Sequence, residues 1–289
     1  MRPLQNTIGV TAVLEAYREM KTRLITAAAL IPLLFVVLYV CPNWVTAWLV
    51  AVMLAIAAYE LLYCTGLVRH VRMVAYSAAA AFAVPLWGHY SIGHGWTVLA
   101  VLAFTALLFG EVMLSHTKVQ FEKVVYCVFA GLAIPNALAS VVRILDGAFG
   151  EFMVMIPFIL AFIPDSGAYF AGRFFGKHKL APVISPKKTV EGAIGGLVTG
   201  MVCMVIYALV LQRAFQFDVN YLFALVYGLI GSLGAIFGDL CFSVIKRQTG
   251  IKDYGNLFPG HGGVLDRFDS VIIVAPLTEA LLELLPVAV

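Results

Sequence analysis

The amino-acid sequence predicts an all-α polytopic integral membrane protein, and its composition and hydropathy pattern lead to this fold class. Of the 289 residues, 62% are hydrophobic and only 12% are charged, with a mean hydropathy of +0.96. Soluble domains carry roughly a quarter charged residues, so this chain has too few polar side chains to cover a surface in water. Its apolar runs are continuous rather than alternating. This favours membrane-spanning helices over a β-barrel and excludes a soluble enzyme or a disordered protein.

Nine apolar runs are candidates for the roughly 20-residue helices that span a bilayer. They are Leu24–Val40, Trp44–Leu62, Val74–Trp87, Trp96–Phe109, Val124–Val142, Phe152–Phe170, Gly192–Leu211, Tyr221–Leu240 and Val271–Leu285. The third and fourth are short, so we expect them to extend into flanking residues. The first lacks a small-residue cleavage site and is interpreted as a retained signal anchor.

Three regions follow from these runs. Residues 1–23 form a cytoplasmic extension, 24–150 an N-terminal region of five helices, and 151–289 a C-terminal region of four helices with two motif-bearing cytoplasmic connections. Met20 offers an internal translation start, so residues 1–19 are expected to be dispensable.

The distribution of Lys and Arg predicts how the helices are oriented. With nine spans, 17 of the 19 basic residues fall on alternate connections, and only Arg143 and Arg213 fall on the others. Basic residues in short loops mark the cytoplasmic side. The pattern predicts a multi-pass protein of the inner, cytoplasmic membrane, with its N-terminus in the cytoplasm and its C-terminus outside.

Acidic residues are expected to gather at the cytoplasmic ends of the helices. Five of the seven aspartates have this position: Asp165, Asp239, Asp253, Asp266 and Asp269. Acids at membrane depth are costly and indicate function. Carboxylates suit Mg²⁺, which usually takes one or two of them together with substrate phosphates. Asp266 and Asp269 share a face if the last helix begins there.

Basic residues that could bind phosphate lie on the same side. Lys187 and Lys188 directly precede the seventh span, and a helix N-terminus presents free N–H groups and a positive dipole end. The last cytoplasmic connection interleaves lysine and arginine with the aspartates, as phosphoryl and nucleotidyl transfer require. From these residues alone, the chain is a membrane enzyme or transporter that handles a phosphorylated, metal-bound substrate.

Three sequence blocks resemble the phosphatidate cytidylyltransferase family, also called CDP-diacylglycerol synthases. They read Asp165-Ser166-x-Ala168-Tyr169-Phe170-x-Gly172-Arg173; Ser185-Pro186-Lys187-Lys188-Thr189-x-Glu191-Gly192; and Ser243-x-Ile245-Lys246-Arg247, Lys252-Asp253, Pro259-x-His261-Gly262-Gly263-x-x-Asp266-Arg267-x-Asp269. Two departures, Ser166 for threonine and Val190 for tryptophan, remove no charge. The close resemblance covers residues 152–270.

The resemblance implies transfer of CMP from CTP to phosphatidate, giving CDP-diacylglycerol and pyrophosphate in phospholipid biosynthesis, with Mg²⁺ required. Whether a second cation acts is open. The implied catalytic residues are Asp239, Lys246, Arg247, Asp253, His261, Asp266, Arg267 and Asp269. The implied phosphate-binding residues are Arg173, Ser185, Lys187, Lys188, Thr189 and Lys252, and the metal ligands are Asp165, Asp239, Asp266 and Asp269. His261 is assigned to binding because a phosphomonoester is mostly ionised at neutral pH and needs no strong base.

The expected partners are CTP, phosphatidate and the bilayer, and no nucleic acid. Two other functions stay open. A CTP-dependent lipid kinase would transfer the γ-phosphoryl group instead of CMP. A transporter of a phosphorylated solute would show charged clusters at mid-membrane and inverted repeats.

Two features of the last spans carry further expectations. Glu279 and Glu283 lie one turn apart, where like charges repel, so protonation, partnering in a homodimer or an aqueous cavity are all open. Glycines recur every four residues in the seventh and eighth spans, at 192, 196 and 200 and at 234 and 238. We expect the two glycine faces to pack together and to bring the Lys187-Lys188 end of the seventh span against the Asp239 end of the eighth.

Overall fold

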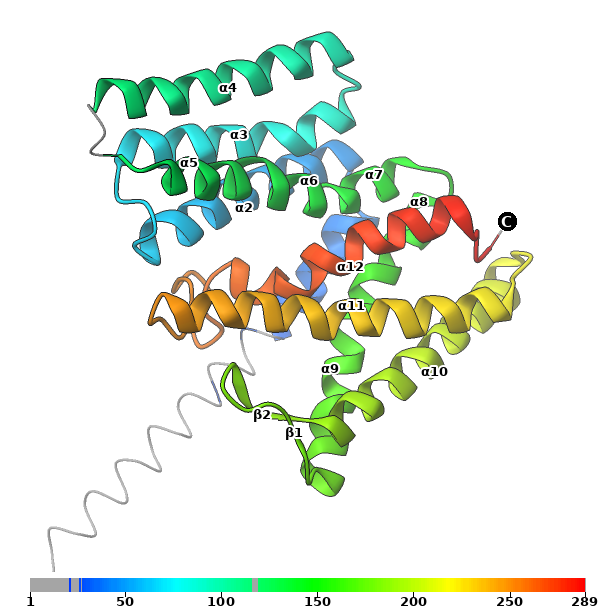
Figure 1. Cartoon of the computed structure of the whole chain (residues 1–289). Helices are drawn as coiled ribbons and strands as arrows, with labels where there is room; N and C mark the ends of the chain where they lie inside the picture. Colours follow the sequence, from blue (N-terminus) through cyan, green and yellow to red (C-terminus); the bar gives the residue numbers. More distant parts are fainter. Residues whose placement is uncertain (1–20, 22–25, 27, 116–118, 289) are drawn as a thin grey trace, which may run out of the picture.

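The computed structural model describes residues 21, 26, 28–115 and 119–288, and these form a mostly helical bundle (Figure 1). Its α-helices are α2 (Asn43–Tyr59), α3 (Val71–His89), α4 (His94–Leu114), α5 (Phe121–Val128), α6 (Ile134–Leu138), α7 (Ser140–Asp146), α8 (Gly150–Met153), α9 (Met155–Phe175), α10 (Val190–Phe215), α11 (Tyr221–Gln248) and α12 (Leu265–Leu284). Two π-helical turns, η1 (Glu60–Cys64) and η2 (Phe129–Ala133), interrupt the α-helical geometry. The expected extension 1–19 lies outside the described residues.

Seven helical segments of the described chain are long and apolar enough to cross a membrane. They are Asn43–Cys64, Val71–His89, His94–Leu114, Phe121–Asp146, Gly150–Phe175, Val190–Phe215 and Tyr221–Gln248. In order, they correspond to the second to eighth expected spans, which confirms the polytopic helical membrane class. The first expected span is described only as the shorter apolar helix Ala28–Tyr39. The ninth position is occupied by α12, whose acidic residues make it more polar than the seven.

Helices near the motif blocks extend beyond the apolar runs that predicted them. Asp165 lies inside α9 and Asp239 inside α11, although both were expected at helix ends. Lys246 and Arg247 occupy the last turn of α11, where positive charge complements the negative end of the helix dipole. The aspartates are therefore held on rigid helical backbone.

A short antiparallel hairpin between α9 and α10 is an addition that the all-α expectation did not include. Strand β1 (Lys179–Ala181) pairs with β2 (Ser185–Thr189). The carboxylate of Glu191 fixes the chain before β1 because it accepts the Lys177 N–H at 3.0 Å and contacts the His178 ring nitrogen Nδ1 at 2.6 Å. The hairpin and the connection 249–264 lie at the same end of the bundle, away from the C-terminus (Figure 1).

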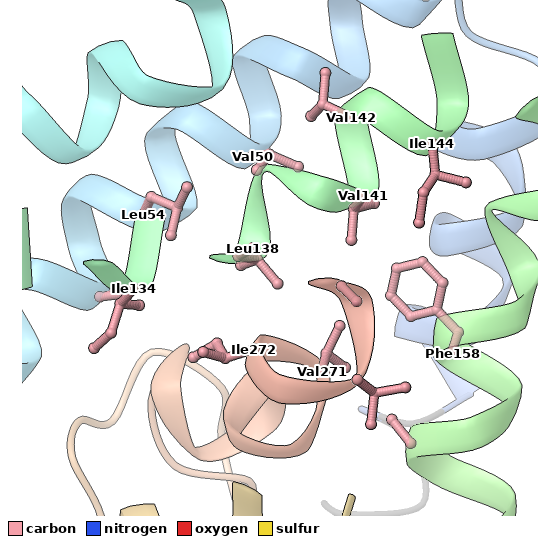
Figure 2. Close-up of a cluster of buried hydrophobic side chains, with 14 of the residues drawn as sticks. Val50, Leu54, Ile134, Leu138, Val141, Val142, Ile144, Phe158, Val271 and Ile272 are labelled. Carbon is pink, nitrogen blue, oxygen red and sulfur yellow. The ribbon is translucent and has the colours of Figure 1, made fainter. Parts of the chain in front are cut away.

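The apolar core joins the first half of the chain to α12. Figure 2 shows Val50 and Leu54 of α2, Leu138 of α6 and Phe158 of α9 around Val271 of α12. Within lipid, helix association depends on close van der Waals packing rather than on exclusion of water. This core therefore fixes α12, and with it the last motif block, against helices from the other half of the sequence.

The glycine faces pack differently from the expectation. A Cβ atom on Gly196 would lie 3.0 Å from the carbonyl oxygen of Pro164, so this glycine contacts α9. A Cβ atom on Gly238 would lie 2.8 Å from the carbonyl oxygen of Asp269 in α12. Only Gly200 of the predicted face faces α11, where it lies against Ser232. The predicted packing of the two glycine faces on each other is therefore wrong, since α9 and α12 cover most of them.

Arg143 and Glu279 form an ion pair between α7 and α12. The Arg143 guanidinium donates to both oxygens of Glu279, at 2.6 and 2.8 Å. Arg143 was expected in a loop but lies in a helix. Glu279 thus has a partner within its own chain. Of the explanations left open for an acid in this span, pairing is the one that the structure shows, and the partner is Arg143 rather than a second subunit. Glu283 is exposed.

Candidate active site

A cavity of about 410 Å³ lies beside the hairpin. Its walls come from the second half of α9, β2, the start of α10, and α11. The lining residues are Asp165, Ala168, Tyr169, Gly172, Arg173, Leu180, Ser185, Lys187, Lys188, Thr189, Gly192, Ala193, Ile236 and Asp239. The fold thus brings the first two motif blocks together with Asp239, which is 47 to 74 residues away from them in the sequence.

Basic side chains form part of the cavity wall. Arg173, in the last turn of α9, donates from Nη1 to the Tyr169 hydroxyl over 3.1 Å. Lys187 is exposed on β2, and its neighbour Lys188 forms an ion pair with Asp239 of α11. The sequence predicted that the helix end carrying Lys187 and Lys188 approaches Asp239, and the Lys188–Asp239 ion pair agrees with this, although the glycine faces do not produce it.

The start of α10 closes the cavity beside these basic residues. Thr189 is the N-cap residue, and its hydroxyl accepts the Gly192 N–H at 3.1 Å. This satisfies one of the free N–H groups that every helix N-terminus presents. Ser185 lines the same wall from the other end of β2. The two hydroxyls are therefore available near Lys187 and Lys188.

Three carboxylates from three helices form an acidic group. Asp165 of α9, Asp239 of α11 and Asp269 of α12 act on one another electrostatically. Ser243, one turn after Asp239, donates to its Oδ1 over 3.3 Å. The basic residues whose charges act on this group are Lys188, Lys246 and Arg267. Because like charges repel at short range, a cation between the carboxylates would stabilise their arrangement.

The acidic group fits Mg²⁺ by its donor chemistry. Among the described residues, no three His, Cys, Asp or Glu side chains converge closely enough to form a complete ion cage. Mg²⁺ does not need such a cage, since it usually keeps several waters and binds one or two carboxylates plus substrate phosphates. Asp165 and Asp239 meet this requirement, because both line the cavity where a phosphate could enter.

Asp266 differs from these carboxylates because its oxygens already hold the chain. Oδ2 accepts the N–H groups of Tyr254 at 2.7 Å and Gly263 at 3.0 Å, and Oδ1 lies 3.0 Å from Lys246 Nζ. The side chain of Asp266 is only 2% exposed. Burial raises the pKa of Tyr254, whose hydroxyl donates to the Phe242 carbonyl at 2.8 Å. Asp266 therefore organises this loop, and its assignment as a metal ligand stays a prediction.

The connection 249–264 folds over the start of α12. Gly260 and Gly262 adopt φ values of +74° and +84°, which favour glycine. A Cβ atom on Gly262 would also lie 2.7 Å from Asp266 Oδ2, so a side chain there would disrupt the loop. His261 donates its backbone N–H to Phe258, and its buried Nδ1 has no hydrogen-bond partner among the described residues.

The remaining predicted residues are not part of the cavity lining. Arg247 donates from Nε to the carbonyl of Ile184 at 3.1 Å and so links the end of α11 to the hairpin turn. Lys252, Asp253 and Arg267 are exposed, and they do not line the cavity. Their predicted catalytic and phosphate-binding roles remain predictions.

Glu60 is a buried polar residue that the sequence analysis missed. It begins the π-turn η1 after α2 and is only 3% exposed. Its carboxylate accepts the N–H groups of Val264 and Leu265, both at 3.0 Å. A single acid at the end of the apolar run Trp44–Leu62 was the available signal, because ionisable residues at membrane depth usually have a function.

The sequence is similar to that of known cytidylyltransferases. The model of a family described as "Cytidylyltransferase family" matches residues 21–285. The phosphatidate cytidylyltransferase of Staphylococcus haemolyticus (strain JCSC1435) is 36% identical over 187 residues, which cover 63% of this chain and 68% of the relative. That of Staphylococcus epidermidis (strain ATCC 12228) is 43% identical over 129 residues, which cover 45% of this chain and 48% of the relative.

Proposed function

The chain belongs to the cytidylyltransferase family, and from this premise we propose that it transfers CMP from CTP to phosphatidate. The products are CDP-diacylglycerol and pyrophosphate. The observation that carries the proposal is the cavity in which Arg173 and Lys187 face Asp165 and Asp239 at one end of an apolar helical bundle. Such a site can receive a soluble nucleotide and a lipid phosphate at the same membrane face.

The proposed reaction needs positioning more than proton transfer. A phosphate oxygen of phosphatidate attacks the α-phosphorus of CTP, and the bond from that phosphorus to the bridging oxygen breaks. Pyrophosphate leaves with the electron pair. Because a phosphomonoester has a second pKa of about 6, the attacking oxygen is mostly ionised at neutral pH. The residues around the cavity therefore have to hold two polyanions in line and balance their charge.

Basic residues of the cavity would bind the phosphates. Arg173 can donate to phosphate oxygens through a planar guanidinium, and Lys187 offers an exposed point charge on β2. Lys188 is already paired with Asp239, so it would both neutralise substrate charge and keep Asp239 in place. Lys246 would balance negative charge of the acidic group, because its ammonium acts electrostatically on Asp269 of α12.

Asp165 and Asp239, which line the cavity, would hold Mg²⁺ as this enzyme's metal cofactor, and Asp269 would add negative charge beside them. The bound ion would supply charge neutralisation on the phosphates. Lys188 would keep Asp239 oriented toward the cavity, because the ion pair fixes that side chain.

The site would face the cytoplasm of a bacterial cell from its inner membrane. The support is the clustering of basic residues on alternate connections, which also favours nine spans, a cytoplasmic N-terminus and an extracytoplasmic C-terminus. In Figure 1 the hairpin and the connection 249–264 share one end of the bundle, as this topology requires. CTP is a cytoplasmic nucleotide, so the orientation suits the substrate.

A double-label assay tests the proposed function. Purified protein in detergent is incubated with phosphatidate, Mg²⁺ and CTP labelled on either the α- or the γ-phosphate, and the lipids are separated by thin-layer chromatography. The proposal expects α-label in lipid and γ-label in pyrophosphate. Transfer of γ-label to lipid would identify a lipid kinase instead, and no reaction with either label would favour a transporter.

A matched pair of arginine variants connects this activity to the cavity. Arg173 and Arg213 are both exposed and both lie in the last turn of an apolar helix, but only Arg173 lines the cavity. Arg173→Gln should lower α-label incorporation by about tenfold or more, the value of a charge-assisted contact, while Arg213→Gln should not lower it. Equal activity of the two variants would contradict this placement of the site.

A further inference from the structure

Two acids are buried in the first half of the chain, outside the motif blocks. Glu60 is 3% exposed and Glu111 is 7% exposed. Glu111 of α4 lies among side chains of α3 and its N-cap, where Tyr76 donates to it over 3.2 Å. Glu60 instead contacts backbone of the last motif block, more than 200 residues away in the sequence. The two acids therefore have similar burial and different partners.

Glu60 caps α12 from another helix. Oε1 accepts the N–H of Val264 and Oε2 that of Leu265, each at 3.0 Å. The first N–H groups of a helix have no partner in the helix itself, and its positive dipole end favours an anion. Val264, the N-cap residue of α12, provides no side-chain hydrogen bond. The carboxylate of Glu60 takes this role.

The loop before α12 is shaped to fit Glu60. A Cβ atom added to either Gly255 or Gly263 would overlap Glu60 Oε1. The chain can pass this close to the carboxylate only where it lacks side chains. Glu60 opens the π-turn η1, a helix geometry that often marks functional positions. The contact is therefore built from both sides.

Glu60 and Asp266 together fix the geometry of the last motif block. They accept the N–H groups of three residues of the connection 249–264 and of the first residue of α12: Tyr254, Gly263, Val264 and Leu265. Asp266 also binds Lys246. The first turns of α12 carry Asp269, which belongs to the acidic group, and Arg267, whose charge acts on that group. The direction of these turns depends on how α12 begins.

We propose that Glu60 is a positioning residue for the reaction. It orients the start of α12 and, through Asp266, the ammonium of Lys246, while it touches no substrate itself. The first half of the chain thereby sets the geometry of the second. This inference rests on the proposed cytidylyltransferase activity, and it adds to that activity a residue outside every motif block.

The test compares Glu60→Gln with Glu111→Gln. Each oxygen of Glu60 accepts one backbone N–H. In Glu60→Gln the amide NH₂ would face one of these N–H groups, so two donors would meet, and the negative charge would be lost. We expect kcat to fall by about 100-fold, as a misplacement of about 1 Å can cause. KM for CTP should stay within about threefold, because Arg173 and Lys187 lie on α9 and β2. Glu111→Gln should keep the wild-type kcat.

A second readout does not depend on activity. If Glu60 holds the loop, trypsin should cleave after the exposed Lys252 faster in Glu60→Gln than in wild type or Glu111→Gln. Wild-type kcat in Glu60→Gln, or equal losses in both variants, would overturn the inference. Inactive wild-type protein would overturn the proposed function instead, and the cleavage rates would still judge the role of Glu60.

A third variant approaches the contact from α12. Val264 has φ of −62°, which proline can adopt, and Val264→Pro removes the N–H that Glu60 Oε1 accepts. Val264→Pro should reproduce the fall in kcat with little change in KM. If Glu60→Gln does not fold, Val264→Pro tests whether the contact with Glu60 positions the start of α12. Full activity of Val264→Pro would overturn the inference.

Discussion

The two sides of the candidate site hold their charges in different ways. On the hairpin side, formed by α9, β2 and the start of α10, Arg173 and Lys187 are exposed and line the cavity. On the loop side, formed by the last turn of α11, the connection 249–264 and the start of α12, the Asp266 side chain is 2% exposed and that of Lys246 is 13% exposed. The exposed charges are free to meet a ligand. The buried charges are already used to hold the polypeptide.

This difference separates residues that look alike in the sequence. Basic and acidic residues occur in all three motif blocks, and composition alone gives them the same phosphate or metal chemistry. Burial and hydrogen bonding divide them into groups that contact substrate and groups that keep the site in shape. A substitution on the hairpin side should change activity alone, and one on the loop side should change activity and stability together.

Asp266→Asn should have the largest combined effect. The amide keeps the size of the carboxylate but leaves Lys246 and two backbone N–H groups, those of Tyr254 and Gly263, without a charged acceptor. Breaking a buried ion pair typically costs about 3 kcal/mol or more in the free energy of unfolding. Thermal unfolding in detergent and the CTP assay should both show the loss. Unchanged thermal stability would contradict the structural role of this carboxylate.

Asp239→Asn should abolish most activity while the fold persists. Asp239 lines the cavity and is about a quarter exposed, so losing its ion pair with Lys188 costs little stability. Removal of one preorganised charge from a phosphate site lowers the rate by about 100-fold or more. The comparison with Asp266→Asn is direct, since both changes are isosteric. A melting temperature as low as that of Asp266→Asn would remove the distinction between the two sides.

Gly196→Leu should reduce activity by a smaller amount, about tenfold, because overpacking separates α9 from α10. The Cβ atom would press on Pro164 and Ala168. Gly110→Leu is the matched control, since no heavy atom lies within 4 Å of its added Cβ. Activity of both variants in the CTP assay, with membrane expression measured in parallel, checks the prediction.

Arg143→Gln should have the smallest effect. Its ion pair with Glu279 joins α7 to α12, and both side chains are partly exposed. We expect a loss of about 1 kcal/mol in the free energy of unfolding and unchanged kcat. Thermal unfolding and the CTP assay measure the two quantities. A large fall in kcat would extend the catalytic machinery beyond the two sides described above.

The sequence predicted the helical membrane class, because long continuous apolar runs span a bilayer as helices. It also predicted that the Lys187-Lys188 end of α10 approaches Asp239, but from glycine faces that do not pack on each other. The sequence placed Asp165 and Asp239 at helix ends because each follows the end of an apolar run. In the structure both helices continue past these aspartates, whose side chains line the cavity. The hairpin was missed for a related reason, since its strands are short and polar.

Glu60 could not be assigned a role from the sequence. Its partners are backbone N–H groups of Val264 and Leu265, which have no side-chain signature. The glycine faces were misassigned because a four-residue repeat shows which residues share a face but not which helix covers it. Gly196 meets α9 and Gly238 meets α12, a choice that only the packed bundle reveals.

The central claim is that the cavity beside the hairpin binds the reacting phosphates, and two exposed lysines test it most directly. Lys187 lines the cavity, whereas Lys177 is also exposed but lies outside the lining. The measurement is kcat/KM for CTP in Lys187→Gln and Lys177→Gln. Loss of a charge-assisted phosphate contact should lower kcat/KM by about tenfold or more in Lys187→Gln, and Lys177→Gln should stay within about twofold of wild type. Equal values for the two variants would contradict the claim.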